Sequence, residues 1–169
     1  FTTNSRTSYR GIMSFDLLNK LEHANSDIER SWLITEAYIS NLPEQLSYAV
    51  FAVATPHWFN TAIIEHLLQI EHVLAEKIYA DLQSLPIVEP LEPVGHALHD
   101  LTRSAILTKR VEADLETIRQ ESQRVLSYFQ SQPNEQNEVE VIYHALWVDP
   151  TGNWHRFEDA MRNYRGKTH

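Results

Sequence analysis

The sequence predicts a mainly α-helical protein with one short β-hairpin. Apolar residues recur at three- and four-residue spacing in most stretches between helix breakers, which is the pattern of an amphipathic helix. Only four glycines interrupt the 169 residues, and the seven prolines gather at a few boundaries. Two short apolar stretches around a proline-broken loop are the exception, and they predict the hairpin.

Two helices are expected at the start of the chain. Ser14 can cap the first of them, and its apolar residues are Phe15, Leu17, Leu18 and Leu21. Ser26 and Glu29 have the spacing of a capping box, which predicts the start of the second. We assign residues 1–11 to a flexible start and residues 12–40 to an N-terminal helical segment.

Three further helices are predicted before the hairpin. Pro43 suits the first turn of a helix, and that helix should end near Thr55 because Pro56 follows. Asn60 is a natural cap for the next helix. The third helix is expected over residues 71–85, where apolar residues again follow the helical period.

The hairpin is expected from the segments 86–90 and 94–98, whose prolines suit edge strands or strand ends. Three helices followed by a β-hairpin is the order of a winged helix, a variant of the helix-turn-helix. We therefore assign residues 41–110 to a helix-turn-helix winged-helix core, flanked by the N-terminal helices and by a C-terminal helical arm.

Downstream of the hairpin, helices are expected over residues 100–109 and 112–129, with residues 111–132 as a connecting long helix. The polar stretch 130–138 has no aliphatic residue before its end and is predicted to be a loop.

The last pair of helices is expected over residues 139–146 and 154–164, joined by a turn at 149–153. This helical hairpin, residues 138–165, resembles one repeat of a helical solenoid. A single repeat cannot bury its apolar face alone, so it should pack on the preceding helix or on further repeats.

Composition limits the class of partner. The formal net charge is −9, from 23 acidic and 14 basic residues, so the field around the molecule repels phosphate backbones and a nucleic-acid partner is not favoured. The chain has no cysteine, which permits a cytoplasmic localisation. The longest apolar run, residues 48–54, is far shorter than the roughly 18 residues of a membrane span, so no membrane partner is expected.

Nine histidines raise the question of a metal site. His96 and His99 have an H-x-x-H spacing, but they are expected in a strand and at a helix start, so a bound metal is not favoured. Adjacent His99 and Asp100 would also suit a metal-dependent phosphohydrolase, with His72 and Asp114 as further ligands. Nothing in the sequence requires these residues to converge.

The turn residues His57, Trp58 and Phe59 are candidates for an interaction surface. The aromatic pair is expected to act as core and inter-helix anchors rather than as a stacking platform for bases, because the chain is acidic.

The most informative motif is Leu98-His99-Asp100-Leu101-Thr102-Arg103, which opens a helix directly after the predicted wing. Together with the preceding helices from residue 42 onward, it resembles the winged-helix domain of signal-transducing P-loop ATPases of the STAND class, which includes NACHT and NB-ARC proteins. The NB-ARC branch carries a Met-His-Asp motif at this place. Here Leu98 replaces the methionine, while His99 and Asp100 match.

The resemblance implies a switch. In that family the motif histidine approaches the β-phosphate of bound ADP, and exchange for ATP frees the winged helix and permits oligomerisation. By this resemblance His99, Asp100 and Arg103 would sense a nucleotide, with Asp100 orienting the loop or capping the helix. An imidazole beside a helix N-terminus suits a phosphate oxygen.

The chain's glycines, Gly11, Gly95, Gly152 and Gly166, cannot form a phosphate-binding P-loop. The expected function is therefore that of a regulatory module without catalytic activity. It would bind no cofactor alone and would read ADP or ATP held by a nucleotide-binding domain of the same protein, with a homo-oligomer as the implied assembly.

One alternative is a winged-helix transcription regulator that binds DNA. It would need basic residues along the third predicted helix, where Lys77 is accompanied by Glu76 and Asp81. The metal-dependent phosphohydrolase is the further alternative.

Overall fold

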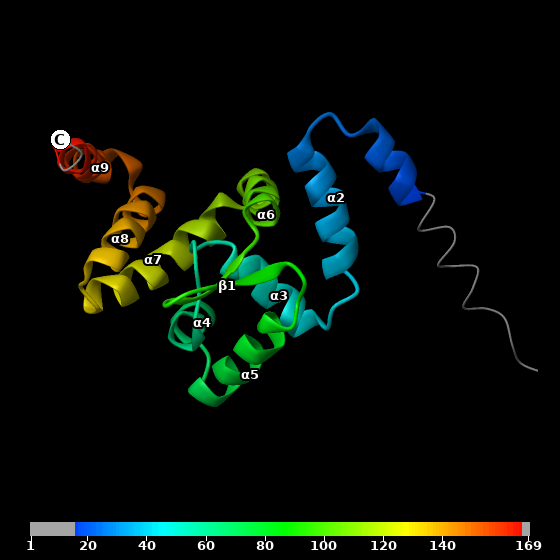
Figure 1. The fold of residues 1–169 in the computed structure, drawn as a ribbon, viewed down its shortest axis with the longest axis horizontal. Helices are drawn as coiled ribbons and strands as arrows, with labels where there is room; N and C mark the ends of the chain where they lie inside the picture. Colours follow the sequence, from blue (N-terminus) through cyan, green and yellow to red (C-terminus); the bar gives the residue numbers. More distant parts are fainter. Residues whose placement is uncertain (1–15, 167–169) are drawn as a thin grey trace, which may run out of the picture.

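The computed structural model describes residues 16–166, and Figure 1 shows their arrangement. Residues 16–23 are helical, and the predicted cap Ser14 and the apolar Phe15 lie outside the described residues. The remaining elements are, in chain order, α2 (Asp27–Ile39), α3 (Glu44–Val53), α4 (Thr61–Leu68), α5 (His72–Gln83), β1 (Val88–Leu91), β2 (Gly95–Leu98), α6 (Asp100–Ala113), α7 (Leu115–Ser131), α8 (Glu135–Val148) and α9 (Pro150–Gly166). The mainly α-helical class with a short β-hairpin is confirmed.

The helix starts follow local capping. The Ser26 hydroxyl accepts a hydrogen bond from the Glu29 backbone N–H at 3.1 Å, as the capping box predicts. The Glu29 carboxylate, however, accepts from the N–H of Asn25 rather than from that of Ser26, at 2.7 Å. At the start of α4 the Asn60 side chain accepts from the N–H of Ile63 at 3.0 Å, so the predicted cap is confirmed.

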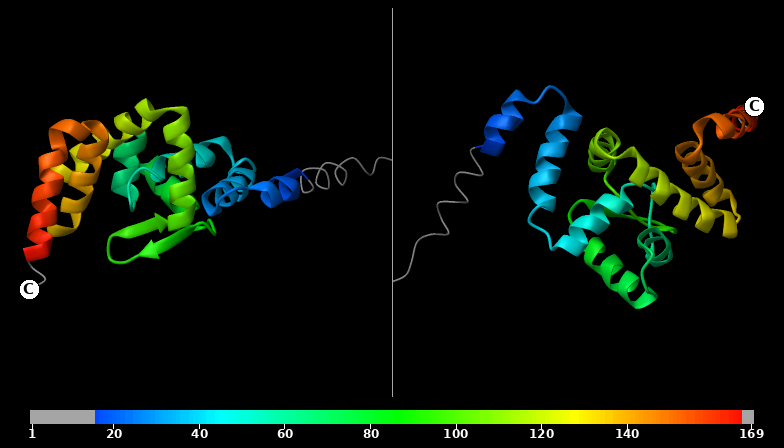
Figure 2. Two further views of the ribbon diagram at one scale, coloured as in Figure 1. Left: turned by 90° about the horizontal axis from the view of Figure 1, so that it is seen from above. Right: turned by 180° about the vertical axis from the view of Figure 1, so that it is seen from behind.

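The elements from α3 to β2 follow one another in the order of a winged helix, and residues 44–98 are called the winged helix below for this order alone. The two strands pair antiparallel, with Val88 opposite Leu98 and Leu91 opposite Gly95. Phe59, between α3 and α4, adds a single bridge to His96, with backbone hydrogen bonds of 2.7 and 2.9 Å. The hairpin projects from the helical body in the left panel of Figure 2.

The close approach of this bridge depends on a glycine. Gly95 has a φ of 148°, and a Cβ at this position would lie 2.3 Å from the carbonyl oxygen of Phe59. A residue with a side chain would therefore force the hairpin and the α3–α4 loop apart.

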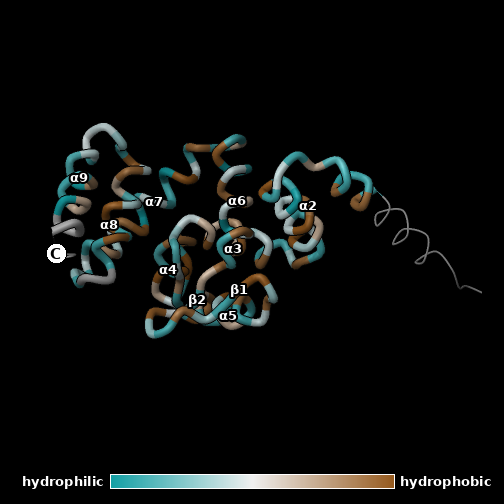
Figure 3. The backbone as a smooth tube through the Cα atoms, turned by 45° about the horizontal axis from the view of Figure 1, so that its top comes forward, coloured by the Kyte–Doolittle hydropathy of each residue, from teal (hydrophilic) through white to brown (hydrophobic). Residues whose placement is uncertain are grey.

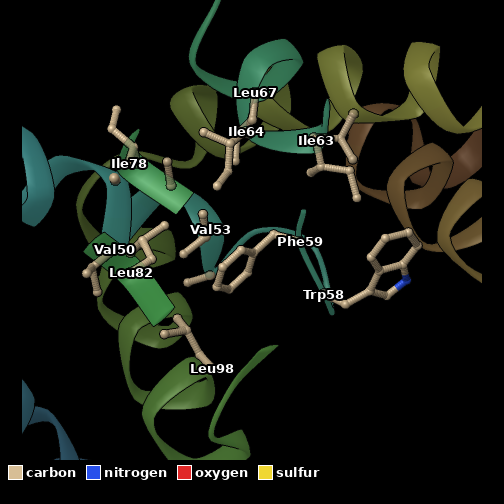
Figure 4. Close-up of a cluster of buried hydrophobic side chains, with 14 of the residues drawn as sticks. Val50, Val53, Trp58, Phe59, Ile63, Ile64, Leu67, Ile78, Leu82 and Leu98 are labelled. Atoms are coloured by element: carbon tan, nitrogen blue, oxygen red, sulfur yellow. The ribbon is translucent and has the colours of Figure 1, made fainter. Parts of the chain in front are cut away.

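The core of the winged helix is apolar and lies between α3, α4 and α5 (Figure 4). Phe59 is fully buried at its centre, and Leu98 joins it from the end of the hairpin. The same cluster includes Ile106 of α6 and Phe129 of α7, so the winged helix and the two long helices share one core. The N-terminal helices and the C-terminal arm lie at opposite ends of the molecule (Figure 1).

Two predicted loops in the C-terminal part exist but are shorter than expected: residues 132–134 in place of 130–138, and Asp149 in place of 149–153. Helix α8 begins at Glu135 rather than near residue 139, because the Asn134 side chain caps it by accepting from the N–H of Asn137 at 2.9 Å. Helix α9 begins at Pro150, in the predicted turn 149–153. Proline is favoured at a first helical position, and the Asp149 carboxylate accepts from the N–H of Gly152 at 2.9 Å.

The arm formed by α8 and α9 differs from the core in composition. Figure 3 shows hydrophobic stretches on α3 and α8, whereas most of α9 is hydrophilic or neutral. None of the helices among residues 16–166 combines the length and apolar character that crossing a membrane requires.

Candidate functional site

The motif after the wing occupies a corner where β2 leads into α6. Leu98 is buried in the core and fixes this corner, while the neighbouring His99 side chain is 48% exposed. The His99 backbone N–H donates to the carbonyl of Ile87 at 3.0 Å, which holds the chain against the start of the wing. The imidazole Nδ1 lies 3.0 Å from a carboxylate oxygen of Glu89 in β1.

The first turn of α6 is exposed at this corner. Asp100 is exposed, and its negative carboxylate interacts favourably with the positive N-terminal end of the α6 dipole. The His99 side chain makes no capping hydrogen bond to α6, and its half-exposed ring faces Glu89 instead. Glu89 faces only Nδ1 of His99, so a phosphate could bind at Nε2, or at Nδ1 by displacing Glu89.

Arg103, the third residue implied by the resemblance, points elsewhere. Its guanidinium donates to the carbonyls of Pro56 and Thr55 at 3.0 and 3.2 Å, and to the Tyr143 hydroxyl at 2.9 Å. Arg103 therefore ties the α3–α4 loop to α8, and the structure does not place its guanidinium with His99.

The residues of the alternative metal sites are not brought together. Asp114 caps the start of α7, so the whole of α6 separates it from Asp100, about 20 Å at 1.5 Å per residue. His72 pairs instead with Glu65, at 2.9 Å. Among the described residues no group of three or more histidines and carboxylates could hold a metal ion.

The H-x-x-H pair is also divided. The Nδ1 of His96 forms a 2.8 Å hydrogen bond with the Tyr79 hydroxyl, inside the winged helix. His99 faces Glu89 at the surface. The two imidazoles thus make different contacts, as expected for one residue in a strand and one at a helix start.

The aromatic turn is mostly core. Phe59 is fully buried, and Trp58 is 9% exposed with its ring edge-on to Phe129 at 5.4 Å. The hypothesis that these two side chains form an interaction surface is therefore wrong, and their expected role as anchors is confirmed. Only His57 of this turn is partly exposed.

Sequence reasoning missed a buried ion pair. Glu121 of α7 is 2% exposed, and its carboxylate lies 2.7 Å from the Arg110 guanidinium of α6. The Thr55 hydroxyl donates to the other oxygen of Glu121 at 2.5 Å, and Arg110 donates to the Phe51 carbonyl at 2.8 Å. A signal existed, since Glu121 interrupts an apolar helix face between Ile118 and Val125.

A second buried carboxylate was also missed. Glu140 of α8 is 3% exposed, and its carboxylate lies 2.7 Å from Nδ1 of His57. Nε2 of the fully buried His144 is 3.4 Å from the other oxygen. Burial opposes ionisation of Glu140, but the two neighbouring imidazoles outweigh it and lower the pKa of Glu140 to about 2.

A groove lies beside the His99 corner, between α2 and α6. Its walls are largely apolar, and Ile34 and Leu101 remain about half exposed there. Thr102, two residues beyond Asp100, also lines it.

No protein-family model matches this chain, and no curated protein or solved structure shows significant similarity to it.

Because the pKa of Glu140 is lowered in the folded protein, we expect the protein to lose stability in acid. Its folded pKa is below the ordinary value of 4.5, so its contribution is complete above about pH 4.5 and is lost as the pH falls toward 2. The shift corresponds to about 3 kcal/mol, of which about 2 kcal/mol is lost between pH 6 and pH 3. Urea unfolding of wild type and Glu140→Gln over this range should show the difference in stability shrinking by that amount.

The matched control is Glu138→Gln, which removes an exposed carboxylate from the same helix. Its stability difference from wild type should stay nearly constant over the same pH range. A Glu140→Gln difference that is equally constant would contradict the role assigned to Glu140.

Proposed function

We propose that this chain is a non-catalytic regulatory module that docks against a nucleotide-binding domain through the His99 corner. The observation that carries the proposal is the exposure of the His99 imidazole at the junction of β2 and α6. A histidine that served only to cap α6 would hydrogen-bond to the helix backbone, and His99 does not.

The chemistry of the corner supports a reversible contact with a phosphate. An imidazole can donate a hydrogen bond to a phosphate oxygen, and the start of α6 adds the positive end of a helix dipole. Glu89 competes for the same ring at 3.0 Å. Displacement of a surface carboxylate costs little, because exposed ion pairs contribute about 0–1 kcal/mol. The His99 ring can therefore exchange the Glu89 carboxylate for a phosphate at little cost in free energy.

The shape of the chain supports coupling to a larger assembly. Leu98 anchors the corner in the core that α6 and α7 share with the winged helix. A displacement of the corner would therefore be transmitted to the helices that carry the C-terminal arm. This coupling is what a module that converts nucleotide state into a conformational change or an oligomer requires.

The DNA-binding alternative gains no support from the surface of α5, the third helix of the winged helix. Its exposed residues include Glu76 and Asp81, with Lys77 between them. Glu89 and Glu92 add negative charge on the hairpin. A recognition helix and a wing with this negative charge would repel the phosphate backbone of DNA.

The test uses the protein with its nucleotide-binding domain present. His99→Ala should accelerate ADP release by about 10- to 100-fold, since hydrogen bonds to charged groups contribute about 1.5–3 kcal/mol. Release is measured by chasing a fluorescent ADP, and the oligomeric state by light scattering.

His155→Ala is the control, since it removes another exposed histidine from the arm. It should leave ADP release and assembly unchanged. If His99→Ala behaves like this control, the proposed switch role is refuted.

A further inference from the structure

The attachment of the arm to the rest of the molecule is unusually polar. Among the side chains of α8 that the structure describes, four are buried. Three of them are polar, Asn137, Glu140 and His144, and the fourth is Ala145. The fully buried members of the apolar core come from other elements of the described chain, and Val141 of α8 packs against them only partly buried. The fully buried positions of α8 are therefore mostly polar, whereas those of the winged helix are mostly apolar.

His144 lies at the centre of this attachment. It has no exposed surface, and its ring stacks on Phe129 of α7, with centroids 6.0 Å apart and planes 17° apart. Nε2 faces the Glu140 carboxylate at 3.4 Å, and neither ring nitrogen makes a hydrogen bond among the described residues. A neutral imidazole can leave one nitrogen without a proton, whereas a protonated ring has an N–H on both.

Protonation of His144 in place would therefore bury an N–H group without an acceptor. Such a group costs free energy, more so when it carries charge. The ring can satisfy both N–H groups only if α8 moves away from α7 and water reaches it. The geometry thus favours the neutral ring when the arm is attached and allows the charged ring when the arm is detached.

The charged groups around His144 come from three elements. Glu140 of the same helix favours protonation, while His57 of the α3–α4 loop and Arg103 of α6 oppose it. The face of α7 contributes the uncharged Phe129. Burial is the largest effect, and the pKa of His144 is lowered from its ordinary value of 6.5.

We propose that protonation of His144 releases α8 and α9 from α7 and the α3–α4 loop, so that the arm is a pH-dependent element of the fold. The proposal does not depend on the function proposed for His99, because it concerns a different site. The winged-helix core stays folded in the released state, since its fully buried residues come from elements other than α8; Phe129 is the core residue that loses a contact when α8 leaves.

The sign follows from proton binding. The attached state binds fewer protons at His144 than the released state, in which the ring has an ordinary pKa near 6.5. Attachment is therefore fully favoured above about pH 6.5 and weakens below it. One proton taken up on release shifts the equilibrium about tenfold between pH 7.5 and pH 5.5.

The absence of cysteine makes a distance measurement direct. Spin labels at Lys77→Cys on α5 and Arg156→Cys on α9 occupy exposed positions and report the distance between winged helix and arm. We expect the populated distances to broaden toward longer values at pH 5.5. A second pair, Gln45→Cys and Lys77→Cys, lies within the winged helix and should not respond.

Substitution tests the origin of the response. His144→Phe keeps a flat ring on Phe129 and cannot take up a proton, so its distances should not depend on pH. If this variant does not fold, His144→Gln provides the same test. His155→Gln on α9 is the control and should retain the full response.

Three outcomes overturn the proposal. They are a wild-type arm distance that is the same at pH 7.5 and pH 5.5, a response that persists without His144, and a simultaneous change in both label pairs. The last outcome indicates unfolding of the whole chain rather than release of the arm.

Discussion

Arg110→Ala should lower the free energy of unfolding by about 3–5 kcal/mol, because it leaves a buried carboxylate without its counter-charge. Glu121 is 2% exposed and lies 2.7 Å from the Arg110 guanidinium. The same guanidinium donates to the Thr55 hydroxyl at 2.9 Å and to the Phe51 carbonyl at 2.8 Å. The substitution thus removes donors from three acceptors at once. Urea unfolding followed by circular dichroism measures the effect.

Lys109→Ala is the matched control, because it removes a cation one residue away on α6. The Lys109 ammonium is 2.8 Å from a carboxylate oxygen of Glu112, but both side chains are well exposed. Such pairs contribute about 0–1 kcal/mol. If Arg110→Ala and Lys109→Ala lose equal free energy of unfolding, burial does not determine the cost of breaking the Arg110–Glu121 pair.

A double substitution separates the value of the ion pair from the cost of breaking it. Arg110→Met with Glu121→Leu replaces both charges by apolar side chains of similar size. Buried pairs replaced in this way often recover most or all of the stability. We expect the double variant to be more stable than Arg110→Ala alone. The double variant should remain less stable than wild type, because the Thr55 hydroxyl loses its hydrogen bonds to both Glu121 and Arg110.

The fold class and most helices could be predicted because their signals are local. A cap such as Ser26 or Asn60 lies within three residues of the N–H that it satisfies, and apolar spacing reports which helix face is buried. The order of three helices and a hairpin then follows from the chain itself. The corner at His99 was found for the same reason, since strand end, histidine and helix start are consecutive.

The errors at residues 130–138 and 149–153 have one physical origin. Asparagine, proline and glycine occur in turns, but asparagine also caps helices and proline also suits a first helical turn. Asn134 and Pro150 have these second roles. Without the packing of α8 on α7, the sequence offers no means of choosing between the two.

The polar networks could not be predicted as pairs. Thr55 and Glu121 are 66 residues apart, and His57 and Glu140 are 83 residues apart. Their contacts depend on how α7 and α8 pack against the α3–α4 loop, which no local pattern encodes. What the sequence does contain is the anomaly of Glu121 on an apolar helix face.

Phe59→Ala should also cost about 3–5 kcal/mol, because it empties the centre of the winged-helix core. The Phe59 ring is fully buried and meets Tyr79 edge-on at 6.2 Å. Its neighbours in the core come from different elements, as Figure 4 shows, so no single helix can move to fill the space. Chemical denaturation gives the loss directly.

Tyr48→Ala is the control for removing an aromatic ring, since Tyr48 of α3 is 54% exposed. Its cost should stay within about 0.5 kcal/mol. Phe59 also joins the helices to the wing through its backbone bonds to His96, and alanine keeps those groups. Amide exchange at His96 therefore separates two effects. Slow exchange in a destabilised Phe59→Ala variant would show that the bridge to His96 forms without the ring. Rapid exchange would show that burial of the Phe59 ring holds the hairpin, and with it the His99 corner, on the helices.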